Sequence, residues 1–299
     1  MFCLGRLCEP VITSSSQIGR YALAKMTHSS NPVIFFPGTG GEIPSFSGFI
    51  VGCSDALRFE ALTYPGWQQY ASETFSIEDL IADLEAQVLV KIPEGPIRIV
   101  GYSIGGHFGY ATALGLRAKG REIAGFCAID SFMIESLRPS ANWKTRAVSE
   151  ALEILRKGQL REFNRFIRSK FWRGLFRLAG GRLRGVVQGL PLNRFLSVCA
   201  FDPILEKELN LRLLTQAVAP WAASLDQEPV VLYAQASLLR TVQTACDDAA
   251  WRRRCPNIEI FEIQGQHQTL LLADDISSLQ EVFSAATRSW YANASTHKP

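Results

Sequence analysis

The stretch "IRIVGYSIGGHFGY", residues 97–110, contains the turn that decides the fold. It begins as an apolar run rich in β-branched residues, breaks at Gly101 and places Ser103 between small residues. In the pattern Gly-x-Ser-x-Gly, a sharp strand-to-helix turn strains the serine backbone, and the flanking glycines avoid clashes with the strand and the helix. We therefore predict a strand over 97–101, a helix over 104–120 and an exposed nucleophile at Ser103.

The overall composition is that of an ordinary globular chain. The 299 residues carry a net charge of +3, with 47% hydrophobic and 20% charged residues, and this length suits one large α/β domain. No apolar run reaches the length of a membrane span, and no secretory signal is evident at the start, so we expect a cytoplasmic location. The seven cysteines are scattered without Cys-x-x-Cys pairs. This pattern predicts no disulfide framework and no metal site, and we expect no bound cofactor.

Five further segments show the pattern of buried strands, namely 32–36, 59–64, 123–130, 229–237 and 257–265. Helical periodicity begins after Ser76, which can form a capping box with Asp79, and it returns in a closing helix over 275–291. Strands that alternate with helices favour a mostly parallel sheet covered by helices on both faces. The predicted fold class is therefore α/β.

A helical insertion interrupts this alternation. We interpret residues 131–228 as a lid on a domain that spans 32–299, and residues 1–31 as an N-terminal extension. The segment 151–185 carries ten Lys or Arg against two acids, a net charge of +8, while the rest of the chain carries −5. As an amphipathic helix it would present arginines to water and pack apolar side chains inward. The arginines are Arg161, Arg165 and Arg168, and the apolar residues are Leu160, Phe163, Ile167, Phe171 and Leu178.

A serine nucleophile needs a base, and histidine is the usual one. Among the four histidines, His28 and His297 lie near the chain ends, and His107 lies on the nucleophile helix, where we expect a packing or hydrogen-bonding role. His267 follows the last predicted strand, at the carboxyl edge where open α/β sheets place their sites. His267 is therefore the candidate base.

A carboxylate that orients the imidazole can come from two places. Asp130 ends the strand that follows the nucleophile helix and so points to the same edge as Ser103. Asp247 and Asp248 follow the next strand by a loop, and either assignment keeps the order Ser, Asp, His. Asp130 is the leading candidate, with Asp247 and Asp248 as alternatives.

Two backbone N–H groups are candidates for an oxyanion hole. One belongs to Ile104, directly after the nucleophile. The other lies in "PGTGG", residues 37–41, where we favour Thr39, with Gly38 as the alternative. This loop lacks the Lys-Ser/Thr of a phosphate-binding loop.

These motifs resemble the thioesterase domains of polyketide and nonribosomal peptide synthases, which are members of the α/β-hydrolase superfamily. The resemblance covers about residues 32–289, with the lid similar in placement only, and Gln266 stands where the family often has an acid. It implies an α/β-hydrolase fold, and it favours Asp130 over Asp247. The motifs that carry it are "VIFFPGTGG" (33–41), "GYSIGG" (101–106), "AIDSF" (128–132) and "GQHQTLL" (265–271).

The resemblance also implies a reaction and a partner. Ser103, deprotonated by His267, would attack a thioester on the phosphopantetheine arm of an acyl or peptidyl carrier protein, and the acyl-enzyme would then be hydrolysed or cyclised. Because carrier proteins are usually acidic, Arg161, Arg165 and Arg168 are candidate docking residues; neither nucleic acid nor a membrane is expected as a partner. The alternatives are a carboxylesterase or lipase of free esters and a non-catalytic hydrolase-fold binding protein.

Overall fold

The computed structural model describes most of the chain. The described residues are 32–39, 46–53, 57–131, 143–156, 158–188, 203–242, 248–267, 270–271 and 273–292. They all belong to the second of two compact units, Asn31–Pro299. The first unit, Met1–Ser30, lies outside the described residues, and so does the predicted extension as a whole.

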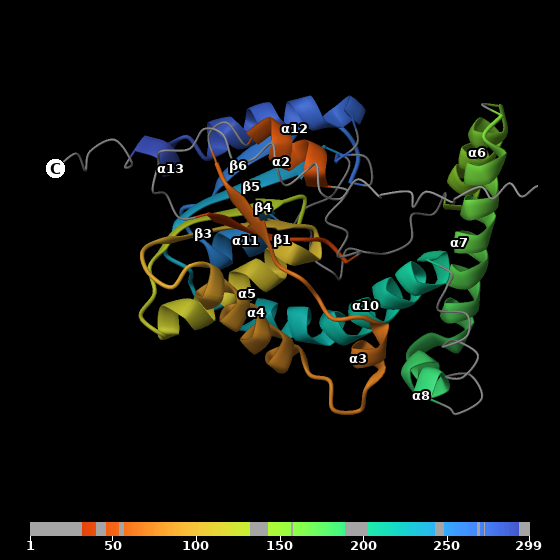
Figure 1. The fold of residues 1–299 in the computed structure, drawn as a ribbon, viewed down its shortest axis with the longest axis horizontal. Helices are drawn as coiled ribbons and strands as arrows, with labels where there is room; N and C mark the ends of the chain where they lie inside the picture. The colour runs from red at the N-terminus through yellow and green to blue at the C-terminus, as the bar shows by residue number, and fades with distance from the viewer. Residues whose placement is uncertain are drawn as a thin grey trace, which may run out of the picture. The chain divides into compact units, whose positions relative to one another are not determined.

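A six-stranded parallel sheet forms the centre of the described domain (Figure 1). Its spatial order is β2-β1-β3-β4-β5-β6, and every adjacent pair is parallel. The prediction of a mostly parallel sheet is confirmed. The strands are β1 (Val33–Phe36), β2 (Phe59–Ala61), β3 (Ile97–Tyr102), β4 (Ile123–Ile129), β5 (Gln235–Thr241) and β6 (Glu259–Ile263).

Helices cover both faces of the sheet, which is why β1 is buried at every position. One face packs against α4 (Ile77–Lys91), α5 (Ile104–Ala118) and α11 (Asp248–Arg254), and the other against α2 (Ser47–Cys53) and α12 (Ala273–Ala286). Figure 1 shows α2 and α12 above the sheet, with α4 and α5 below it. Two hydrophobic cores result, one on each side of the strands.

A local signal in the sequence accounts for the start of α4. Ser76 caps α4 as predicted, since its hydroxyl oxygen accepts the N–H of Asp79 at 3.0 Å. The predicted closing helix is two helices, α12 and α13 (Ser289–Ala292). They separate at Thr287, whose N–H and hydroxyl both donate to the carbonyl of Phe283. Among the described residues no helix is both long and apolar enough to cross a bilayer.

The predicted strand over 229–237 is wrong by several residues. Val230 and Tyr233 are 62% and 68% exposed, so this apolar run stays outside the sheet. The strand runs from Gln235 to Thr241 and includes a buried serine, Ser237, whose hydroxyl donates to the carbonyl of Ala286 at 3.2 Å. A polar residue with a satisfied hydrogen bond can occupy a strand that the sequence pattern assigns to apolar residues. Strand β2 is also shorter than predicted, since it ends at Ala61.

The described residues between β4 and β5 form helices and their connections, with no strand among them. The helices are α6 (Trp143–Arg156), α7 (Leu160–Ala179), a 3-10 turn (Gly180–Arg182), α8 (Leu183–Gln188) and α10 (Pro203–Gln227). Helix α10 contacts α3 (Trp67–Ala71), the short helix after β2. The inward packing predicted for α7 is wrong for Leu160, Ile167, Phe171 and Leu178, which are all exposed. A different face of α7 packs against α10, and Phe176 is its buried aromatic residue.

Candidate active site

The turn between β3 and α5 holds Ser103 at φ 55° and ψ −124°, a conformation that non-glycine residues rarely adopt. The flanking glycines make this turn possible. A Cβ atom on Gly101 would lie 2.3 Å from the carbonyl oxygen of Gly105, and a Cβ atom on Gly105 would lie 2.2 Å from that of Phe36. The N–H of Ser103 donates to the carbonyl of Ile129 at 2.9 Å, so the turn is also attached to β4.

Three predicted residues form one chain of hydrogen bonds at the carboxyl edge of the sheet. Ser103 Oγ lies 3.1 Å from His267 Nε2, and His267 Nδ1 lies 2.7 Å from Asp130 Oδ2. Because a carboxylate oxygen accepts hydrogen bonds, Nδ1 carries the proton, and the lone pair of Nε2 faces the serine hydroxyl. The imidazole is thus oriented to take a proton from Ser103.

The carboxylate of Asp130 is fully buried and held from three sides. Its Oδ1 accepts the backbone N–H of Thr241 at 3.0 Å and the hydroxyl of Thr241 at 3.1 Å, while Oδ2 faces His267. The backbone of Asp130 has φ 46° and donates its N–H to Leu239 at 2.6 Å. These bonds offset the cost of burying the carboxylate and fix its direction. Sequence reasoning missed Thr241, because β5 was placed too early in the chain.

Tyr102 connects the nucleophile turn to the histidine loop. Its hydroxyl donates to the backbone carbonyl of His267, and its ring stacks on the imidazole with centroids 5.2 Å apart and planes at 10°. Burial, together with the nearby charge of Asp130, raises the pKa of Tyr102 well above its ordinary value, so the phenol stays protonated and remains a donor. Sequence reasoning did not single out Tyr102, although it lies inside the serine motif.

Trp251 supports the residue that follows the carboxylate. Its Nε1–H donates to the carbonyl of Ser131 at 2.6 Å, and the guanidinium of Arg254 lies 5.2 Å from the Trp251 ring centroid. Arg254 also donates to Nδ1 of His107 at 2.9 Å, since a guanidinium has no acceptor. His107 is therefore a buried packing residue with a hydrogen bond, as expected from its place on the nucleophile helix.

The two segments that carry the predicted oxyanion donors approach Ser103 from different sides of the turn. Ile104 is the first residue of α5, and a helix leaves its first N–H groups without intrahelical acceptors. The loop after β1 comes close to the same point, since a Cβ atom on Gly38 would lie 3.5 Å from Ser103 Cβ and 3.1 Å from Tyr102 Cδ1. Thr39 follows Gly38 in this loop and remains a predicted donor.

The other predicted site residues lie elsewhere. Asp248 pairs with Arg240 at 3.2 Å, and Asp130 is the carboxylate that contacts His267. Asp247, His28 and His297 fall outside the described residues. Arg161, Arg165 and Arg168 lie exposed on α7. Within the described part of the chain, no group of three His, Cys, Asp or Glu side chains is arranged to hold a metal ion.

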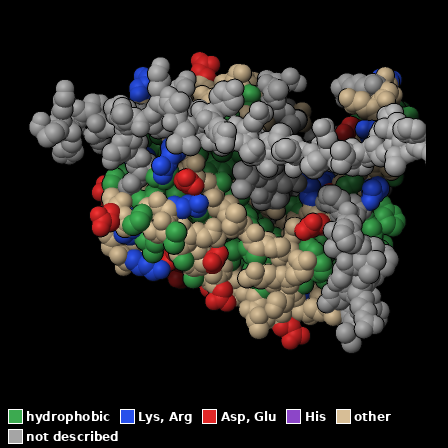
Figure 2. Space-filling view, in the orientation of Figure 1, with side chains coloured by type: hydrophobic (Ala, Val, Ile, Leu, Met, Phe, Trp, Pro, Cys, Tyr) green, Lys and Arg blue, Asp and Glu red, His purple; other side chains and the backbone are tan. Residues whose placement is uncertain are grey.

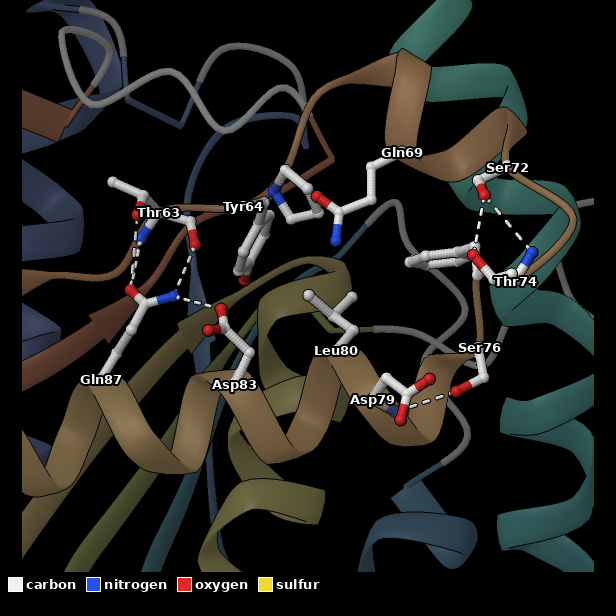
Figure 3. Close-up of a pocket in the computed structure, with 12 residues that line it drawn as sticks. Thr63, Tyr64, Gln69, Ser72, Thr74, Ser76, Asp79, Leu80, Asp83 and Gln87 are labelled. Carbon is white, nitrogen blue, oxygen red and sulfur yellow. Dashed lines mark hydrogen bonds between the residues drawn. The ribbon is translucent and has the colours of Figure 1, made fainter.

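A cavity of about 530 Å³, lined mostly by residues with polar side chains, lies between the segment after β2 and helix α4 (Figure 3). Figure 3 shows the Gln87 side chain joined to Thr63 and Asp83 by hydrogen bonds along one side of it. The hydroxyl of Tyr64, another lining residue, donates to the carbonyl of Pro37 at 2.8 Å, directly before Gly38. The described residues that line the cavity include none of Ser103, His267 and Asp130.

Comparisons with known proteins agree with this architecture. Residues 31–171 match the family described as "Thioesterase domain". A non-reducing polyketide synthase, atnG, from Arthrinium sp is 37% identical over 90 residues, which are 30% of this chain and 4% of that protein. The solved NocB thioesterase domain, in covalent complex with a fluorophosphonate nocardicin G analog, is 18% identical with a TM-score of 0.55, over 87% of this chain and 95% of its own. The Vlm2 thioesterase domain is 17% identical with a TM-score of 0.53, over 85% and 91%.

The parallel sheet, the covering helices and the sharp turn at Ser103 define an α/β-hydrolase fold, as predicted. Within that class, residues 31–171 carry the thioesterase domain match, and the resemblance to the thioesterase domains of polyketide and nonribosomal peptide synthases is confirmed.

We expect Gly105→Ala to destabilise the domain, because its Cβ atom would meet the backbone oxygens of Phe36 and Pro37 at 2.2 and 2.5 Å. Overpacking of this kind costs about 1–3 kcal/mol, measurable by urea unfolding. Gly174→Ala in α7 is the matched control, since nothing lies within 4 Å of its added Cβ atom. That substitution should stabilise the protein by about 0.5–1 kcal/mol. Equal unfolding midpoints for the two variants would contradict the steric argument.

We expect Tyr102→Phe to lower kcat for a short acyl thioester about fivefold with KM unchanged, because the loss of a hydrogen bond worth about 1 kcal/mol loosens the His267 backbone. The matched control is Tyr110→Phe on α5, which removes a hydroxyl that donates to the carbonyl of Val230, away from the imidazole. Both variants should lose similar stability, and kcat should fall only for Tyr102→Phe. A parallel fall in both would assign the effect to general loosening.

Proposed function

We propose that this chain is a serine thioesterase that releases an acyl chain from the phosphopantetheine arm of a carrier protein through a Ser103 acyl-enzyme. One observation carries the proposal: Ser103, His267 and Asp130 are joined by hydrogen bonds of 3.1 and 2.7 Å at the carboxyl edge of a thioesterase-type domain. The roles assigned to these residues, and the carrier as partner, are part of the proposal.

The first half-reaction forms the acyl-enzyme. His267 Nε2 takes the hydroxyl proton of Ser103 while Oγ forms a bond to the thioester carbonyl carbon. The negative charge on the carbonyl oxygen is stabilised by the N–H of Ile104 and by a second N–H from the loop after β1, for which Thr39 is the proposed donor. When the C–S bond breaks, the departing thiolate takes the proton from His267.

The second half-reaction frees the chain. Water, or a hydroxyl or amine within the acyl chain, gives its proton to His267 Nε2 and attacks the ester carbon. Ser103 leaves with the proton that His267 returns, and the product is a free acid or a ring. Throughout both steps Asp130 stabilises the imidazolium and is itself held by Thr241. No bound cofactor takes part, because the phosphopantetheine belongs to the substrate.

A mass measurement tests the nucleophile. Incubation with an acyl-pantetheine thioester should give an intact-protein mass that corresponds to one acyl group on Ser103. In Ser103→Ala this adduct should be absent, and kcat should fall by about four to six powers of ten. Ser237→Ala, which changes a buried serine of β5, is the control and should keep both.

The same measurement separates the alternatives. Acylation by simple esters but not by thioesters would identify a carboxylesterase, and full function in Ser103→Ala would identify a non-catalytic binding protein. Either result would overturn the proposal.

A further inference from the structure

Helix α7 exposes a continuous apolar series along one face. Leu160, Ile167, Phe171 and Leu178 follow one another at intervals of seven, four and seven residues, which places them on the same side of the helix. They are 71%, 47%, 62% and 87% exposed, and Leu175 beside them is 45% exposed. We call these five residues the α7 stripe. A soluble helix normally turns such a face toward the core, so the outward direction needs a cause.

The opposite face of α7 supplies that cause. Glu208 on α10 is 3% exposed, and its two carboxylate oxygens accept hydrogen bonds from Ser169 Oγ and Arg173 Nε, each at 2.6 Å. Phe176 is buried on this side as well. Turning α7 to bury the stripe would leave the Glu208 charge buried without these partners, which is strongly destabilising. The buried ion pair therefore fixes the stripe on the outside.

Basic side chains lie next to the α7 stripe. Arg161, Arg165 and Arg168 are exposed, and α7 as a whole carries six basic residues against one acid, Glu162. Figure 2 shows hydrophobic and basic side chains beside each other at the right-hand edge, where Figure 1 places α7.

Helix α6, which contacts α7, carries a second exposed apolar series. Val148, Leu152 and Leu155 follow at helical intervals and are 60%, 48% and 42% exposed. Apolar residues at such intervals, with cationic neighbours, are the pattern that receives a helix of opposite charge.

We infer that the α7 stripe and its three arginines dock an acidic amphipathic helix of a partner protein. Under the proposed function, on which this inference rests, that partner is the carrier that brings the thioester. The stripe extends over about 27 Å, enough for a helix of about five turns. A second copy of this chain fits poorly, because it would set the net charge of α7 against an equal positive charge.

Binding can be measured apart from turnover in the Ser103→Ala background, with an acyl carrier protein that bears a hexanoyl-phosphopantetheine arm as the probe. Two variants should each raise the Kd for the carrier about tenfold or more. One is Ile167→Asn/Phe171→Asn, and the other is Arg161→Glu/Arg165→Glu/Arg168→Glu. With Ser103 restored, both should hydrolyse a hexanoyl N-acetylcysteamine thioester at the wild-type rate. Controls are Val90→Asn, 80% exposed on α4, and Arg253→Glu/Arg288→Glu, exposed elsewhere.

Three results would overturn the docking surface. The first is an unchanged affinity for the carrier in both sets of variants, and the second is an equal loss of turnover on the carrier-bound and the small thioester. The third is that the stripe mediates binding to phosphatidylserine vesicles, or dimerisation, but no binding of the carrier. Failure of the proposed function looks different: the wild type would turn over neither thioester, while the carrier would still bind through the stripe. Because the substituted side chains are exposed, unfolding midpoints should stay close to wild type in every variant.

Discussion

The strained backbone of Ser103 is the constraint from which the rest of the site follows. It persists because Gly101 and Gly105 let β3, α5 and the end of β1 approach more closely than any side chain would permit. The same close approach places Tyr102 against the loop that holds Gly38 and against the ring of His267. The turn at Ser103, the loop after β1 and the loop that carries His267 thus meet at one point because of a backbone geometry that only this spacing of glycines allows.

Two hydrogen bonds position His267, one at its ring and one at its backbone. The Nδ1 of the His267 ring is hydrogen-bonded to Asp130, and the backbone carbonyl of His267 accepts the Tyr102 hydroxyl. Both the ring and the loop that carries it are therefore positioned. Asp130 has one oxygen for His267 and one for Thr241, which prevents the carboxylate from turning away. Preorganisation of this kind removes much of the reorientation that a reaction would otherwise require.

The sequence was informative where the signal was local. The runs at 32–36, 97–101 and 123–130 predicted strands close to those observed, because short apolar segments bounded by glycine or proline fit a doubly covered sheet. Ser103 followed from its motif and His267 from elimination and topology, whereas Asp130 was the leading candidate with Asp247 and Asp248 as alternatives. Thr241 was missed because β5 contains a buried serine in place of an apolar residue. The outward face of α7 could not be predicted, since amphipathicity identifies an apolar face but not the buried Glu208 that turns it away.

The long excursion between β4 and β5 leaves the sheet after Ile129, at the carboxyl end of β4, and re-enters it at Gln235, the first residue of β5, which lies opposite Gly125. The hydrogen bonds between β4 and β5 therefore fix both ends of the excursion. The entropy of closing a loop grows only logarithmically with its length, by about 0.6 kcal/mol for each doubling. Lengthening or shortening an exposed connection within this excursion should thus be thermodynamically inexpensive, whereas α10, whose leucines are buried in the core, ties the excursion to the domain.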